Sequence, residues 1–192
     1  MPKHQRKRLN VPTLPKRNAV GMGGKMSFLP LKRRELEVKP SQVPWHFGSA
    51  RLSQNQIKEI LNKYKIVAVV GLSKEPEKES HKVSVYLKQQ GYRIIPVNPF
   101  ADEVLDEKSY PSLLDIPPEI AKSIEVVNIF RRADDVPSII DQAIKLKKLY
   151  GKPFVVWMQL GIINEQAAEK ARQVGLVVVM DKCLMVEHHL LS

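Results

Sequence analysis

Residues 67–85 of the 192-residue chain read VAVVGLSKEPEKESHKVSV. The apolar run ends in Gly71, and nine residues later Ser80 opens a segment with helical spacing. This is the outline of a turn that cradles a phosphate, because glycine lets the backbone approach a ligand and a helix N-terminus favours an anion. The stretch lacks both the G-x-G-x-x-G and the G-x-x-x-x-G-K-[ST] patterns. It therefore predicts an anion site without specifying the ligand.

Side chains around this turn support the same interpretation. We expect Ser80 to cap the following helix through its hydroxyl group. Three lysines add positive charge within reach of the turn: Lys74, Lys78 and Lys82. The alternative is that Gly71 and Ser80 are ordinary turn and cap residues and that the lysines are solvated.

Apolar runs and helical segments alternate regularly on both sides of this unit. Strand-like runs occupy residues 66–71, 92–97, 124–130, 154–158 and 176–180. Helical spacing marks residues 80–90, 134–149, 164–174 and 182–190. The strands are continuously apolar, which is typical of a parallel sheet buried on both faces. The pattern predicts an α/β fold with a doubly wound, mostly parallel sheet of about five strands.

The remaining segments are less regular. Ser53 is expected to cap a helix whose apolar face is Ile57, Ile60 and Leu61. The connection over 98–123 is longer, and its segment YPSLLDIPPEIA (110–121) is expected to hold only a short helix. Gly91, Gly151 and Gly175 each follow a helical segment, where a left-handed residue commonly ends the helix.

The charge of the chain is concentrated at its N-terminus. The net charge is +11, yet residues 1–34 alone carry ten basic side chains and no acid. Six prolines and four glycines lie within residues 1–50, which we interpret as a basic extension without a core of its own, followed by a domain over 51–192. We expect this extension to bind RNA or a ribosome-like particle. The residues predicted to contact phosphates are Lys3, Arg6, Lys7, Arg8, Lys16, Arg17, Lys25, Lys32, Arg33 and Arg34.

Composition also bears on location. The single cysteine, Cys183, excludes an intramolecular disulfide framework and fits a reducing compartment. No apolar run approaches the length of a membrane span, so we expect a soluble, cytoplasmic protein with no membrane partner. The mitochondrial matrix is the alternative, because the acid-free N-terminus resembles a presequence. Pro12, Pro15 and the GMGG run at 21–24 would interrupt a long amphipathic helix there.

The carboxyl ends of the predicted strands define a candidate binding crevice, since ligands of such sheets bind there. Polar or cationic residues follow these ends, and neither paired carboxylates nor a Ser-His-Asp arrangement is present, so no catalytic residue is assigned. A fold that binds NAD usually places a carboxylate after the second strand, whereas this chain has Asn98 and Pro99. An uncharged side chain tolerates a phosphorylated ribose, which favours NADP or coenzyme A.

Six segments together resemble a known family over about two thirds of the chain. They read VAVVGLSKEPEKESHKVSVYL, GYRIIPVNP, YPSLLDIP, VVNIFRR, VWMQLGIINEQAAEKA and VVMDKCLMVEH. The chain resembles the small, single-domain CoA-binding proteins, which have a Rossmann-like fold related to the CoA-binding domain of the succinyl-CoA synthetase alpha subunit. The resemblance implies coenzyme A, or an acyl-CoA, as the ligand. The basic N-terminal extension is atypical of this family.

The resemblance also implies roles for individual residues. Contacts with the CoA phosphates are implied for Gly71, Ser73, Ser80, Lys82 and Arg131, and Leu72 is counted among the cofactor-binding residues without a more specific role. Contacts with the adenosine are implied for Asn98 and Pro99, and contacts with the pantetheine arm for Gln159 and Gly161. Cys183 follows the fifth strand, where its thiol faces either the CoA sulfur or the core. Two positions depart from the family pattern, which often has Arg at Lys78 and Gly at Asp106.

Other functions remain open at this stage. His188 and His189 are adjacent on a predicted helix and therefore point in different directions, so we expect a solvated or packed helix end and no metal site. An enzyme that uses NADP or CoA in a reaction of unknown type is one alternative. A structural subunit of a ribosome-like assembly, in which the CoA fold is a scaffold, is another.

Overall fold

The computed structural model describes residues 52–191, and the basic extension over 1–50, with its predicted RNA contacts, lies outside the described residues. The first element is helix α1 (Gln54–Lys63). Ser53 caps it as expected, because its hydroxyl accepts from the Gln56 backbone while the Gln56 side chain accepts from Ser53 N–H at 2.8 Å. Ile57, Ile60 and Leu61 are buried, which confirms the predicted apolar face.

The central sheet has five parallel strands in the order β2-β1-β5-β6-β7. Their bounds are β1 (Ile66–Val70), β2 (Arg93–Val97), β5 (Val126–Ile129), β6 (Val155–Met158) and β7 (Val177–Val179). All residues of β5, β6 and β7 are buried, as a sheet covered on both faces requires. The predicted doubly wound, Rossmann-like α/β fold is confirmed.

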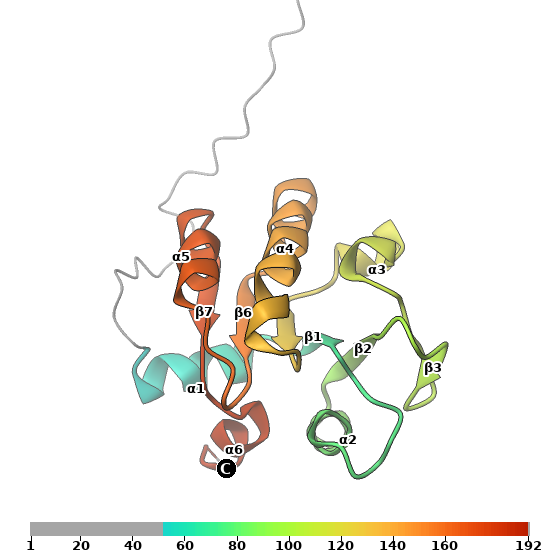
Figure 1. Ribbon diagram of the computed structural model, residues 1–192. Helices are drawn as coiled ribbons and strands as arrows, with labels where there is room; N and C mark the ends of the chain where they lie inside the picture. The colour runs from blue at the N-terminus through green and yellow to red at the C-terminus, as the bar shows by residue number, and fades with distance from the viewer. Residues whose placement is uncertain (1–51, 192) are drawn as a thin grey trace, which may run out of the picture. The chain divides into compact units, whose positions relative to one another are not determined.

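Helices cover both faces of this sheet (Figure 1). Helices α4 (Val136–Tyr150) and α5 (Glu165–Gln173) lie on one face. Helices α1, α2 (Glu79–Gln89) and α6 (Leu184–His189) lie on the other. Each face has its own apolar cluster. The α1–α6 side is also tied by a hydrogen bond, in which Tyr92 Oη donates to the Leu61 carbonyl at 2.7 Å.

The connection between β2 and β5 holds more structure than the sequence predicts. Strands β3 (Glu103–Val104) and β4 (Glu107–Lys108) form a hairpin, followed by the 3₁₀ turn η2 (Leu113–Asp115) and helix α3 (Pro118–Ala121). Both residues of the hairpin turn are left-handed, with φ of 58° at Leu105 and 61° at Asp106. Helix α3 is the short helix expected within residues 110–121, whereas the sequence did not predict the β3–β4 hairpin.

The strand order fixes where a ligand can bind. The chain moves from β1 to β2 at one edge, returns across β1 to β5, and continues to β6 and β7. The order thus reverses between β1 and β5, and the carboxyl ends of those two strands mark the crevice expected in such sheets. Within residues 52–191, no helix is long and apolar enough to cross a membrane.

Candidate functional site

Gly71 stands at the point where the strand order reverses. Its N–H donates to the Val97 carbonyl of β2 at 2.8 Å, while Phe130 N–H donates to Val70 O at 2.8 Å. Gly71 has a φ of 87°, and a Cβ at this position would lie 2.7 Å from Phe130 O and 2.9 Å from Cδ of Arg131. A larger residue would clash with the Phe130 backbone just after β5, so glycine is what lets the two strand ends approach each other.

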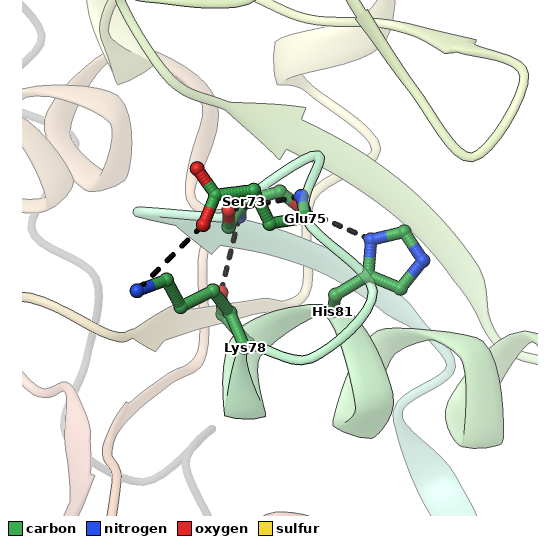
Figure 2. Close-up of polar contacts among 5 residues, drawn as sticks. Ser73, Glu75, Lys78 and His81 are labelled. Atoms are coloured by element: carbon green, nitrogen blue, oxygen red, sulfur yellow. Dashed lines mark hydrogen bonds and ion pairs between the residues drawn. The ribbon is translucent and has the colours of Figure 1, made fainter.

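Hydrogen bonds shape the loop after Gly71. Ser73 N–H donates to the Ser80 hydroxyl at 3.0 Å, and Glu75 N–H donates to the Ser73 hydroxyl at 3.1 Å. The His81 ring faces the Ser73 carbonyl (Figure 2), and its Nδ1 lies 3.0 Å from the carbonyl oxygen. Two of these bonds hold the loop onto the first turn of α2, and the bond from Glu75 to Ser73 fixes the loop internally.

The expected helix cap is wrong. Lys78 is the N-cap of α2, and Ser80 lies inside the first turn with only 6% of its surface exposed. The Ser80 hydroxyl instead accepts the Ser73 N–H. Among residues 52–191, no acceptor contacts the N–H groups of Glu79 and Ser80, which remain available at the helix N-terminus.

A pocket of about 350 Å³ opens beside this turn. Its lining comprises Gly71, Ser73, Glu75, Lys78, Glu79, Ser80 and Phe130. The expected cationic character is only partly present, because Lys78 Nζ lies 3.6 Å from Glu75 and Lys82 Nζ lies 2.8 Å from Glu79. Figure 2 shows the Lys78 ammonium directed at the Glu75 carboxylate. An anion entering this pocket would therefore compete with two carboxylates for the lysines.

Asn98 links the ends of β1 and β2. Its Nδ2 donates to the Leu72 carbonyl at 2.8 Å, and its Oδ1 accepts from Phe100 N–H at 2.9 Å. The Leu72 side chain is fully buried, so only its backbone can face a ligand. Pro99 is exposed beside Asn98. The strand end is thus uncharged, as the sequence indicates.

Arg131 follows β5 and reaches across Gly71. Its Nη2 lies 3.1 Å from Asp135, and its Nε donates to the same carboxylate at 3.2 Å. The guanidinium is exposed, and its stem packs over Gly71. Arg131 is therefore the cation nearest to the switch point among the predicted site residues.

Gln159 serves a different part of the fold. It is 3% exposed, and its Nε2 donates to Asn128 Oδ1 at 2.8 Å while its Oε1 accepts from Leu184 N–H at 3.3 Å. Asn128, in β5, was not predicted as a site residue, because a single amide inside an apolar run has no sequence signal of its own. Its Nδ2 is buried without a hydrogen-bond partner in the described chain. The Gln159 side chain thus joins β5, β6 and α6.

The loop after β6 is braced from β7. Gly161 N–H donates to Asp181 Oδ1 at 2.7 Å, and Asp181 itself has a left-handed φ of 58°. Lys182 Nζ lies 2.7 Å from Glu187 Oε1, and Glu187 is buried. Cys183 is partly buried and packs against the apolar cluster under α6.

His188 packs into the fold, as expected. It contacts the rings of Tyr86 and Tyr92 edge-on, and its Nδ1 lies 3.0 Å from Tyr86 Oη. Burial, together with the nearby charge of Lys65, holds the pKa of His188 below its usual value. In the described chain no three His, Cys, Asp or Glu side chains gather closely enough to hold a metal ion.

The predicted site residues follow the carboxyl ends of the strands, but only some of them gather around one pocket. Gly71, Ser73 and Ser80 line a common pocket, and Arg131 packs over Gly71. Lys82 lines a neighbouring groove along α2 with His81 and Tyr86. The remaining predicted residues follow the ends of β1, β2, β6 and β7 and do not line that pocket.

Similarity to known proteins covers the same part of the chain. A family model described as a CoA binding domain matches residues 65–189. The uncharacterized protein YneT of Bacillus subtilis is 40% identical over 136 residues, which make up 71% of this chain and 94% of that protein. A hypothetical protein from Pyrococcus horikoshii has a similar solved structure, with a TM-score of 0.66, 40% identity, and coverage of 76% of this chain and 99% of its own.

A larger enzyme contains a similar segment. The acetate–CoA ligase (ADP-forming) II of Archaeoglobus fulgidus is 46% identical over 65 residues, or 33% of this chain. Those residues make up 10% of the ligase. The likeness therefore concerns one segment of that enzyme.

Proposed function

The chain belongs to the family of CoA-binding domains, and on that premise we propose that it binds coenzyme A or an acyl-CoA along the carboxyl edge of its sheet. The observation that carries this proposal is the bare backbone of Gly71 at the switch point, with Arg131 above it and the α2 N-terminus beside it. A diphosphate fits such a place, because N–H groups and a guanidinium both donate to phosphate oxygens.

The end of β2 supports CoA over NAD. Asn98 uses its amide to hold the turn and places no carboxylate there. A ribose that carries a phosphate is therefore not repelled, whereas the usual carboxylate contact with an unmodified ribose is missing.

The ion pairs of Lys78 and Lys82 make the proposed binding depend on salt concentration. In the free protein Lys78 and Lys82 are held by Glu75 and Glu79. Both pairs are exposed, so breaking them costs little. We expect the ligand phosphates to take over these lysines, which makes binding weaken as salt is added.

Calorimetry with CoA, dephospho-CoA and NAD tests the ligand. We expect CoA to bind most tightly, and equal or tighter binding of NAD would refute the proposal. Arg131→Ala should weaken CoA binding by about 1–3 kcal/mol if a charge-assisted hydrogen bond is lost. Arg93→Ala is the matched control, because Arg93 is also exposed but lies at the opposite, amino end of β2.

The composition of residues 1–34 supports a second function. We propose that this basic, acid-free segment docks the protein on RNA or on a ribosome-like particle, since Lys and Arg release counterions from a phosphate backbone. If about six phosphates are contacted, the logarithm of the affinity should fall with the logarithm of salt at a slope of roughly −4 to −5. Neither proposal includes a catalytic step.

A shortened chain beginning at Ser49 tests this docking. It keeps Ser53 and the whole of α1, so the domain should fold and should still bind CoA. Sedimentation with ribosomes and RNA binding at two salt concentrations should both be lost. If the shortened chain still sediments with the particle, the extension is not the anchor.

A further inference from the structure

Two large apolar side chains stand exposed beside the end of β6. Leu160 is 69% exposed and Ile163 is 52% exposed. Leu160 precedes Gly161 and Ile163 follows it by two residues in the short loop that leads from β6 to α5. Phe100 is also exposed, but it follows β2 on the other side of the switch point. The β6 loop therefore presents an apolar surface of its own at the carboxyl edge of the sheet.

This loop is held firmly in place. Besides the bond from Gly161 to Asp181, Ile162 N–H donates to the Gln159 carbonyl at 2.9 Å. Asn164 caps α5 and donates through Nδ2 to the Ala133 carbonyl at 3.0 Å. Because the backbone is braced at several points, the two side chains cannot turn inward without breaking these contacts. Their exposure is a property of the built loop.

The position of the loop relates it to the proposed ligand, on which this inference rests. Strand β6 lies two positions from β1 in the sheet, which is about 10 Å at the usual strand spacing. With the diphosphate at Gly71 and the adenosine toward β2, the pantetheine arm runs over β5 toward β6. Its sulfur end, and any acyl group on that sulfur, then reaches the loop of Leu160 and Ile163.

We propose that Leu160 and Ile163 receive the acyl chain of an aliphatic acyl-CoA, so that the ligand of this site is a neutral acyl thioester in preference to free CoA. The negative charge of Asp181 beside the loop indicates which acyl groups are disfavoured. The exposed carboxylate of Asp181 lies against Gly161 N–H at 2.7 Å, and Lys182, the next residue, is already paired with Glu187. A dicarboxylic acyl group such as succinyl would bring a second negative charge to Asp181, which disfavours it.

The expected preference can be stated as a ratio of affinities. Full burial of one methylene group strengthens binding about fourfold. An open surface buries only one side of the acyl chain. The free energy gained per methylene is then about half as large, and the affinity rises about twofold per methylene. From acetyl to octanoyl, six methylenes added, the affinity should therefore rise by about 60-fold.

The test is calorimetry with CoA, acetyl-CoA, octanoyl-CoA and succinyl-CoA on the full chain and on Leu160→Ser/Ile163→Ser. The double variant should bind CoA as the unchanged protein does but should lose the dependence on chain length. Leu149→Ser is the matched control, since Leu149 is 68% exposed near the end of α4 and should leave the dependence intact.

Each outcome decides a separate question. If CoA binds and chain length has no effect, this inference is wrong while the proposed CoA site stands. If no CoA compound binds, the proposed function itself fails. If the double variant instead converts a dimer into a monomer in sedimentation and leaves acyl affinity unchanged, the apolar surface is an interface between copies of the chain and the acyl site is refuted.

Discussion

Replacing Gly71 with alanine should separate the role of the switch point from the general need for glycine in a left-handed turn. Gly71 has a φ of 87°, and alanine in this region costs about 1–2 kcal/mol in any context. In addition, the new Cβ would lie 2.7 Å from the Phe130 carbonyl oxygen. That atom belongs to the backbone and cannot swing away, so relief requires the ends of β1 and β5 to move apart. Overpacking of this kind costs about 1–3 kcal/mol more.

Gly91→Ala is the control for the first of these two costs. Its φ of 81° is nearly the same, yet a Cβ at Gly91 meets nothing within 4 Å. Urea denaturation followed by far-ultraviolet circular dichroism should show a loss of about 1–2 kcal/mol for Gly91→Ala and about 2–5 kcal/mol for Gly71→Ala. CoA affinity should fall in Gly71→Ala alone. Equal loss of stability in both variants would show that the close approach of the strands has no energetic weight, and the reasoning would be wrong.

Three further changes address other parts of the domain. Asp106→Gly should stabilise the β3–β4 hairpin by up to about 1 kcal/mol, because glycine accepts the φ of 61° freely; a lower melting temperature would contradict this. Lys182→Ala should destabilise by about 2–4 kcal/mol by leaving the buried Glu187 carboxylate unpaired, and adding Glu187→Leu should recover most of that loss in urea denaturation. His188 has a folded pKa below its unfolded value of 6.5 because of burial and of Lys65, so stability should fall as pH drops below about 6.5 and level off once the folded protein is also protonated. His188→Gln should flatten that pH dependence, and an unchanged profile would assign it to another group.

The five strands and the helices between them could be predicted because burial on both faces leaves a plain signal. Runs such as Val67–Val70 and Val155–Met158 are apolar throughout, as expected of strands that are covered on both faces. The capping box at Ser53 is also local, since both partners lie within four residues of each other. The β3–β4 hairpin was missed for the opposite reason. Its strands have two residues each, and its left-handed turn uses Leu105 and Asp106 in place of glycine.

The site was harder to predict because its details depend on contacts between distant residues. Ser80 has the sequence position of a helix cap, but its hydroxyl is used by the N–H of Ser73 once the loop folds back. Asn128 and Gln159 are 31 residues apart and find each other only in the folded sheet. A sequence reveals that such side chains are polar, whereas their partners are set by the register of β5 against β6.

Helix α1 has a consequence for how this domain should be delimited. The region shared with the family begins at residue 65, just after α1 ends at Lys63. Yet Ile57, Ile60 and Leu61 are part of the apolar cluster on one face of the sheet, and the Leu61 carbonyl accepts the hydroxyl of Tyr92. A protein cut at the boundary of the homologous region would expose that apolar face to water and would lack the carbonyl that accepts the Tyr92 hydroxyl. The cooperative unit of folding is therefore longer than the segment shared with the family, and it includes helix α1 with its cap at Ser53.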